Sequence, residues 1–282
     1  SQAMAKSAQD KGVDIQVSTA VAEIIVEQGS AQGVVLDDGK VIRARAVAGN
    51  VNPKILYLDL VGRGALDSDF VRALEGYRCR SGTFRMNIAL SELPVFDGLK
   101  VGEGLELITG TVEIAHSLEY LERAYDDAKY GGWAKKPIVS MCMPSLIDDS
   151  LAPPGAHVAS LFCQHFNPEL SGGRSWDDVK ETVADQVIDT ISQYAPNLKN
   201  AIIGRSILSP LDLERDYALP GGDIFHGALD LDQIFSLRPV AGYADYRSPV
   251  KGLYLCGAGA HPGGGVSGAP GHNAAREIIR DL

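Results

Sequence analysis

Several features are missing from this sequence, and each absence excludes a class of protein. No run of 18 apolar residues occurs, so no membrane-spanning helix is predicted. The four cysteines are scattered without a CxxC pair, which argues against a disulfide framework, a zinc site or any other metal site. Basic residues number 26 against 36 acidic ones, and the net charge of −10 argues against a nucleic-acid ligand, because phosphates require a basic surface.

The sequence is otherwise that of an ordinary globular protein. Its 282 residues are 45% hydrophobic and 22% charged, enough for one large domain or two smaller ones with a sizeable core. Residues 1–11 are typical of a helix terminus closed by Gly12, and they do not form a signal peptide. We therefore expect the natural chain to begin earlier, and reduced cysteines indicate a cytoplasmic protein.

The first fifty residues predict short strands. Val13–Val17 alternates apolar and polar residues, as a half-buried strand does. Val21–Val26 and Gly33–Leu36 are rich in β-branched residues, and Asp38-Gly39 is a hairpin turn signal. Ala46–Asn50 predicts a further short apolar strand.

The middle of the chain alternates loosely between strands and helices. Phe84–Leu90, Ile138–Met143 and His157–Cys163 are strand candidates. The clearest helix follows Ser175, with Asp178 as its capping-box partner and apolar residues spaced by three and four. This alternation predicts a mixed sheet with helices on it.

The tail has the pattern of a phosphate site. Gly252–Gly257 predicts a buried strand, residues 257–268 contain six glycines, and Ala269–Leu282 predicts a helix. Glycines let backbone N–H groups approach a ligand closely, and a helix N-terminus adds partial positive charge. A flexible surface loop is the alternative interpretation.

Sharper motifs do not fit this loop. A dinucleotide fingerprint, GxGxxG, aligned on Gly257 fails at Pro262, and the chain ends at Leu282 without room for a second strand. An NAD-dependent dehydrogenase is therefore disfavoured. A nucleophile elbow, GxSxG, fails at Ala269. We interpret the tail as the closing strand, loop and helix of a domain that begins earlier in the chain.

Leu253–Val266 resembles the C-terminal flavin motif of the phytoene dehydrogenase and carotenoid isomerase family. Gly221–Gly227 and Asp232–Phe235 upstream, and Gly12–Ile15 and Gly33–Gly39 near the start, also resemble segments of that family. The resemblance covers essentially the whole chain, and the tail is its most specific part. It implies an FAD-dependent oxidoreductase whose N-terminal part, with the GxGxxG on the pyrophosphate, is not in this sequence.

The resemblance also implies an architecture. We expect an α/β fold with mixed α and β elements: a partial, Rossmann-like FAD-binding domain and a mixed-sheet substrate domain. Residues 1–53 would supply segments of the FAD-binding domain, and residues 54–245 the substrate domain. Residues 246–282 would close the FAD-binding domain.

The expected chemistry is hydride transfer between an apolar small molecule and the flavin of the full-length protein, with this chain inactive alone. A non-catalytic module that binds a ligand or partner is the alternative. His226 and His261 are candidate catalytic residues, with a structural role as the alternative for each. An apolar substrate leaves a peripheral membrane contact open, and the oligomeric state is not predicted. The expected cofactor-binding residues are Val21, Asn50, Gly257, Ala258, Gly259, His261, Pro262, Gly263, Gly264, Gly265, Val266 and Ser267.

Overall fold

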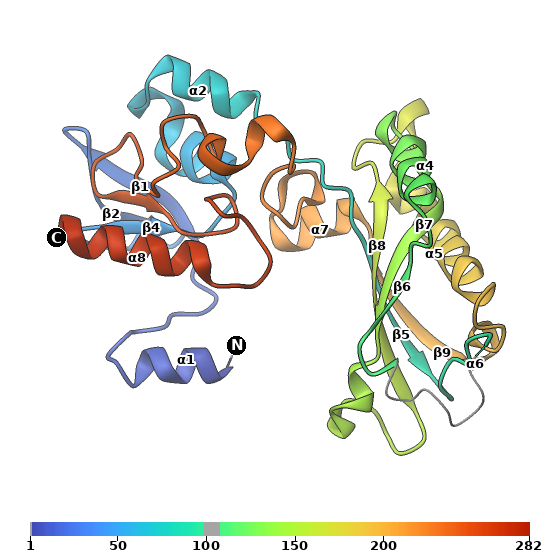
Figure 1. Ribbon diagram of the computed structural model, residues 1–282. Coiled ribbons are helices and arrows are strands. Elements are labelled where there is room, and N and C mark those ends of the chain that lie inside the picture. The colour runs from blue at the N-terminus through green and yellow to red at the C-terminus, as the bar shows by residue number, and fades with distance from the viewer. Residues whose placement is uncertain (1, 99–107) are drawn as a thin grey trace. The chain divides into compact units, whose positions relative to one another are not determined.

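The computed structural model describes residues 2–98 and 108–282. Contacts divide the chain into two units (Figure 1). Unit 1 comprises the segment up to Tyr77 together with Asp230–Leu282, and unit 2 comprises Arg78–Leu229. Residues 54–77 and 230–245, which the sequence predicts to be in the substrate domain, therefore make their contacts within unit 1. The assignment of flavin binding to one unit and substrate binding to the other stays a prediction.

Unit 1 opens with an exposed helix and a three-stranded antiparallel sheet. Helix α1 (Gln2–Gln9) buries no residue. The sheet has the order β1 (Val21–Glu27), β2 (Ser30–Leu36) and β3 (Val41–Arg43), with the predicted turn at Asp38-Gly39 joining the last two strands.

One strand prediction in this region is wrong. Residues 13–17 form no strand, and Val13, Ile15 and Val17 are exposed. Their alternating pattern is that of a strand, but they pair with no described strand of the chain, and an alternating pattern alone does not supply ladder hydrogen bonds.

A short parallel pair joins the two ends of the chain. Strand β4 (Val47–Gly49) pairs with β10 (Leu253–Leu255), and Leu253 lies opposite Val47. All three residues of β10 are buried. Helix α8 (Ala269–Asp281) follows β10, so the predicted closing strand, loop and helix are present, and the helix lies beside the pair (Figure 1).

The core of unit 1 lies between these strands and a set of short helices. The π-helix η1 (Ile55–Gly62) is followed by η2 (Arg63–Ala65) and α2 (Ser68–Glu75), and η7 (Leu231–Gln233) and η8 (Phe235–Leu237) come from the later segment. Tyr57 and Phe70 pack edge to face with ring centroids 5.0 Å apart. They share one buried cluster with Leu253 and Leu255, so the glycine-rich loop emerges directly from this core.

Unit 2 is built on a five-stranded sheet with the order β6-β7-β8-β5-β9. The strands are β5 (Phe84–Leu90), β6 (Thr111–Ile114), β7 (Trp133–Cys142), β8 (His157–Phe166) and β9 (Ile202–Leu208). Every described pair is antiparallel, whereas the alternation of elements predicts a mixed sheet. β7 and β8, for example, follow one another along the chain with only short 3₁₀ turns between them, and such a connection joins antiparallel strands, whereas a parallel pair needs a long crossover.

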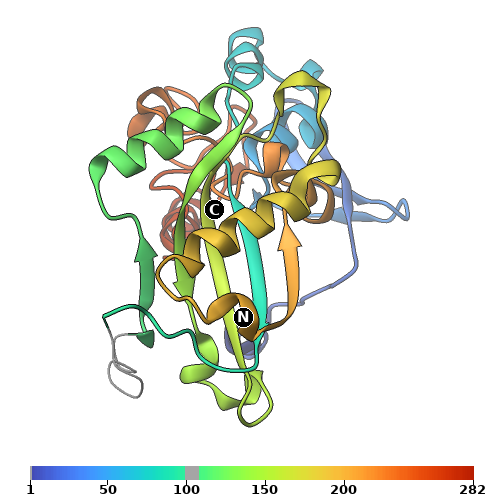
Figure 2. The same ribbon diagram turned by 90° about the vertical axis from the view of Figure 1, so that its right-hand side faces the viewer.

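Helices cover one face of this sheet, and α5 crosses it (Figure 2). The prediction for α5 (Trp176–Ser192) is confirmed, including the capping box between Ser175 and Asp178. The other α-helices are α4 (Leu118–Lys129), α6 (Leu198–Ala201) and α7 (Pro210–Tyr217). Short 3₁₀ turns complete the unit: η3 (Pro144–Leu146), η4 (Asp149–Leu151), η5 (Ser171–Gly173) and η6 (Pro220–Gly222).

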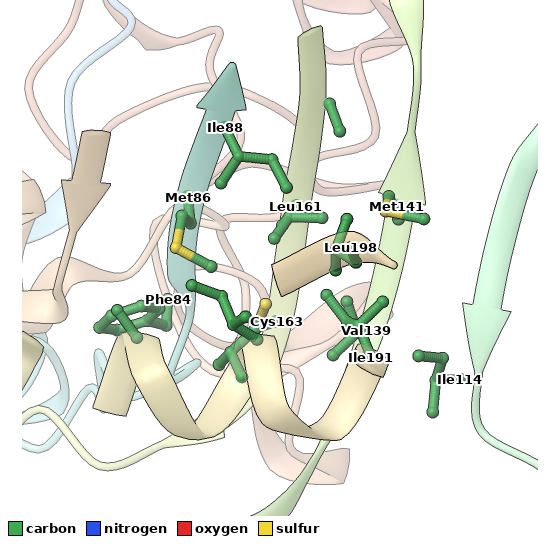
Figure 3. Close-up of a cluster of buried hydrophobic side chains, with 14 of the residues drawn as sticks. Phe84, Met86, Ile88, Ile114, Val139, Met141, Leu161, Cys163, Ile191 and Leu198 are labelled. Carbon is green, nitrogen blue, oxygen red and sulfur yellow. The ribbon is translucent and has the colours of Figure 1, made fainter. Parts of the chain in front are cut away.

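The core of unit 2 follows the strand period of two. Figure 3 shows alternate residues of three neighbouring strands, among them Met86, Leu161 and Val139, pointing toward Ile191 of α5. The residues between them in sequence face the opposite side of the sheet, where Asn87 and Cys142 are exposed. The sheet of unit 2 therefore has one helix-covered face and one face on which no described helix of the unit packs.

The start of α7 gives a test of unit 2 stability. Asp212 accepts hydrogen bonds from the backbone N and Oγ of Ser209, at 3.0 and 2.7 Å, and from Nζ of Lys180 at 3.0 Å. Burial alone would raise the pKa of Asp212, but these hydrogen bonds hold it below its ordinary value of 3.8. We expect Asp212→Asn to cost about 1–3 kcal/mol at neutral pH.

Because the folded-state pKa of Asp212 is lowered, this stabilisation is fully present above the unfolded value of 3.8 and is lost as the pH falls through the folded value. The difference in Tm between wild type and Asp212→Asn should therefore shrink in strong acid. Asp216→Asn, on the exposed side of the same helix, is the control and should leave Tm nearly unchanged. A Tm difference for Asp212→Asn that is independent of pH would contradict this account.

Candidate cofactor-binding site

The two parallel strands of unit 1 bring two predicted site residues together. Asn50 directly follows β4, and Gly257 closely follows β10, so both lie at the same edge of the pair. A Cβ atom at Gly257 would overlap Oδ1 of Asn50 and lie 2.8 Å from its backbone oxygen. Only glycine fits at this position, because even a methyl group would force the two segments apart. In open α/β sheets, ligands bind beyond this carboxyl edge of the strands.

The glycine-rich loop, residues 257–268, starts in the core and ends in solvent. Ala260 N donates to Gly257 O at 3.0 Å, and Gly263 N donates to Ala260 O at 2.7 Å, so the first half is a series of tight turns. Residues 264–268 are exposed, and Val266 is wholly accessible with a φ of 56°. The exposed half of the loop therefore presents backbone groups that a ligand can reach.

The spacing GxGxxG does occur in this loop, at Gly263, Gly265 and Gly268. An alignment that starts at Gly257 misses this register. All three glycines have positive φ, at 97°, 113° and 71°, and α8 begins directly after the third. The match is still incomplete as a dinucleotide fingerprint, because β10 ends at Leu255, well before Gly263, so the strand does not lead directly into the first glycine.

The surroundings of the loop favour a negatively charged group. Gly268 is the N-cap of α8 and provides no side-chain cap, and the first turn of the helix has no acidic residue. No Asp or Glu occurs between residues 257 and 276, although the whole chain carries a net charge of −10. The partial positive charge of the helix N-terminus is therefore not neutralised by a nearby carboxylate.

Arg238 supports the loop from within. Its side chain is buried, and Nε and Nη2 donate to Ala258 O at 3.1 and 2.9 Å. Nη1 donates to Gln233 O at 3.2 Å, and a Cβ atom at Gly263 would lie 3.7 Å from Nε. The guanidinium thus joins the η7 segment to the base of the loop. The sequence marks Arg238 only by the proline that follows it, which gives little sign of this role.

The end of α8 is fixed by a second arginine. Arg247 donates to both carboxyl oxygens of Asp281, at 2.8 and 2.9 Å, and to Glu277 at 2.8 Å. Tyr254 in β10 donates to Asp281 at 2.8 Å. These hydrogen bonds lower the pKa of Asp281 and raise the pKa of Arg247. They connect α8 to β10, so both ends of the loop are held by the same two elements.

The remaining predicted residues lie apart from this cluster of contacts. His261 lies in the loop, half-buried, with its ring 6.4 Å from that of the exposed Phe235. His226 belongs to unit 2 and has a φ of 57°. Val21 opens β1, where it pairs with Leu36. The roles assigned to these three residues from the sequence stay predictions.

Unit 1 also contains a cavity of about 680 Å³. Its lining includes Arg45, which lies two residues before β4, and Lys251, which lies two residues before β10. The cavity is therefore at the end of the parallel pair opposite to Asn50 and Gly257. In the part of the chain that the structure describes, no group of three or more side chains is arranged to hold a metal ion. Nor does any described helix have the length and hydropathy needed to cross a bilayer.

Comparison with known proteins identifies the relatives of this chain. It is 43% identical over 289 residues to pyridine nucleotide-disulfide oxidoreductase domain-containing protein 2 of Mus musculus, a match that covers 100% of this chain and 50% of that protein. It is 27% identical over 296 residues to the phytoene desaturase (lycopene-forming) of Pseudescherichia vulneris, covering 99% of this chain and 54% of that protein. The chain is therefore similar, over its whole length, to proteins of this oxidoreductase family.

The resemblance inferred from the glycine-rich tail is thus confirmed. The chain spans about half the length of the curated relatives it matches and corresponds to their C-terminal half. No protein-family model matches it. The crystal structure of an oxidoreductase from Methanosarcina mazei has the same fold, with a TM-score of 0.63 and 15% identity, over 100% of this chain and 53% of that one.

The close approach at Gly257 gives a direct test of the site. We expect Gly257→Ala to destabilise unit 1 by about 1–3 kcal/mol, because the added methyl group would overlap Oδ1 of Asn50 and lie 2.8 Å from its backbone oxygen. The control is Gly271→Ala within α8, where a Cβ atom would lie 3.8 Å from Cys256 O and alanine favours the helix. Chemical denaturation measures both. Equal stability of the two variants would contradict the close packing at Gly257.

Arg238 gives a second test. Arg238→Met fills a similar volume but leaves Ala258 O and Gln233 O without this donor. Loss of a hydrogen bond to a buried polar group lowers the free energy of unfolding by about 1–3 kcal/mol. We expect a lower Tm and faster proteolysis within residues 257–268. Arg238→Lys keeps the charge but not the paired contact with Ala258 O, and it should be intermediate. Unchanged proteolysis of the loop in Arg238→Met would show that the arginine does not support it.

Proposed function

We propose that this chain is the C-terminal part of an FAD-dependent oxidoreductase that transfers hydride between a substrate C–H bond and the flavin. The observation that carries the proposal is the glycine-rich loop at the common carboxyl edge of β4 and β10, in a chain that is similar over its whole length to oxidoreductases. That edge is where α/β folds hold nucleotide cofactors, and this loop has the glycines, the positive φ angles and the uncapped helix N-terminus that such a ligand needs.

Each part of the site has a role in this proposal. Bound FAD would supply the hydride acceptor or donor. Asn50 and the segment Gly257–Gly259 form the edge against which the cofactor would lie, and the exposed amides of residues 264–266 would face its negative charge. Val21 is assigned to the adenine end by resemblance alone. His261 in the loop and His226 are the candidates for moving a proton.

The proposed substrate is an apolar small molecule. The support comes from the relatives, which include phytoene desaturases and a limonene dehydrogenase polypeptide of Castellaniella defragrans. Such substrates partition into lipid, so the proposal includes a cytoplasmic protein that touches a membrane at its periphery.

We further propose that the chain alone binds FAD weakly and is inactive. The parallel sheet of unit 1 has two strands, and a two-stranded sheet is not a complete nucleotide-binding domain. The relatives are about twice as long. The preceding part of the natural protein would supply the remaining strands and the pyrophosphate turn.

Flavin content tests this proposal. The purified chain should carry no stoichiometric flavin after gel filtration and should bind added FAD weakly by fluorescence quenching. Co-expression with the preceding segment of its natural protein should give a yellow complex. Gly265→Val should lose the flavin from that complex, because φ is 113° at this position, whereas Gly271→Ala should keep it. Stoichiometric flavin in the chain alone would refute weak binding, and a colourless complex would refute the flavoprotein assignment.

A further inference from the structure

The face of the unit 2 sheet on which no described helix packs carries an unpaired cation. Arg85 lies on this face of β5, directly opposite Phe162 of β8 on one side and Leu208 of β9 on the other. Its guanidinium carbon lies 5.5 Å from the centroid of the Phe162 ring, and Nη2 donates to Ser160 Oγ at 3.1 Å. Arg85 is half-buried, so its charge is partly removed from water.

The sheet register explains why no acid neutralises this charge. Glu113 of β6 lies in the same row as Arg85, but Ser140 and Phe162 stand between them. Three strand spacings of roughly 4.8 Å put the backbones of the two residues about 14 Å apart, with two other side chains between them. Glu113 instead accepts a hydrogen bond from Ser140 Oγ at 2.7 Å. Within residues 2–98 and 108–282, Arg85 forms no ion pair.

Two other arginines of unit 2 are neutralised by ion pairs. Arg205 of β9 faces the helix-covered side and is paired with Glu181 and Asp185 of α5. Arg215 of α7 is paired with Asp177. The chain has 36 acidic and 26 basic residues, so acidic partners are in excess, and an unpaired arginine on a half-buried surface is unusual.

Two free side-chain amides and an apolar strip surround Arg85. Asn87 lies two residues further along β5 and Gln164 two residues beyond Phe162 in β8, and neither side chain has a hydrogen-bond partner among the described residues. Phe162 and Ile138 are half-buried and lie on this same face. The face therefore combines a fork-shaped cation, spare hydrogen-bonding groups and apolar area within neighbouring positions.

We propose that this face is a binding site for an amphiphilic anion. Arg85 receives its carboxylate through the free edge of the guanidinium, Asn87 and Gln164 supply hydrogen bonds, and Phe162 with Ile138 contacts its apolar body. The site needs no flavin. In the oxidoreductase proposed above, the ligand would be the substrate or product, a mostly apolar molecule with one acidic group, and that identification rests on the proposed function.

Binding of 4-phenylbutyrate, compared with the uncharged 4-phenylbutanol, tests the site. The two probes share the ring and the chain and differ in the carboxylate. Measured by isothermal titration and by saturation-transfer NMR on the purified chain without flavin, 4-phenylbutyrate should bind at least about 10-fold more tightly, the value of one charge-assisted hydrogen-bonded pair. Added salt should weaken the binding.

Variants assign the effect to Arg85. Arg85→Gln should remove the preference for the carboxylate, and Arg85→Lys should retain part of it, because lysine keeps the charge but not the fork. Arg215→Gln removes the same charge at a paired surface position and should bind the probe within about twofold of wild type. Circular dichroism checks that each variant folds. If Arg85→Gln does not fold, the partial loss of carboxylate preference expected for Arg85→Lys tests the proposal.

Three results would overturn the proposal: no binding of 4-phenylbutyrate, equal binding of the alcohol, or equal loss of affinity in Arg85→Gln and Arg215→Gln. None of these results bears on flavin binding, which is measured on the glycine-rich loop. If the anion binds but the flavin tests fail, the site stands and its ligand is not a substrate of a flavoenzyme.

Discussion

The pairing of β4 with β10 is the interaction on which unit 1 depends. Three residues of each strand pair in parallel, although about 200 residues separate the two strands in sequence. The entropic cost of closing a loop grows only slowly with loop length, so this long separation is tolerated. Cys256 N extends the ladder by donating to Gly49 O at 2.9 Å. Parallel strands require a crossover connection, and here the crossover contains the whole of unit 2. Without this pairing, Asn50 and the glycine-rich loop would not meet.

So short a ladder is stabilised by what surrounds it. Leu253 and Leu255 are buried in the same cluster as η1 and α2, and Arg238 and Arg247 fix the loop and helix that follow β10. Arg247 is half-exposed and forms ion pairs with Asp245, Glu277 and Asp281. Arg238 is buried, and its guanidinium donates to the backbone carbonyls of Ala258 and Gln233. The loop can thus be exposed on one side and rigidly held on the other, as a cofactor-binding turn must be.

Much of this could be predicted from the sequence because it is local. The β2–β3 hairpin, the capped helix α5 and the closing strand, loop and helix each follow from residues close together in the chain. The strand predicted at residues 13–17 failed because pairing is not local. The division by contacts places η1 in unit 1, which its apolar residues alone do not reveal, because such residues do not show which core they join. The role of Arg238 was hidden for the same reason, since its acceptors lie five and twenty residues away.

The distribution of charge links the two candidate sites. Asp177, Glu181 and Asp185 lie on α5 and are paired with arginines there, so part of the acidic excess is held on the helical side of unit 2. The glycine-rich loop contains no carboxylate at all, and Arg85 lies about three strands from Glu113 in its own row. A strongly acidic chain repels anions at long range. Local positive potential at these two places is helped by the lack of carboxylates nearby. The unpaired Arg85 and the uncapped N-terminus of α8 each lack a stabilising partner within the described chain, and the anions proposed for the two sites would supply one.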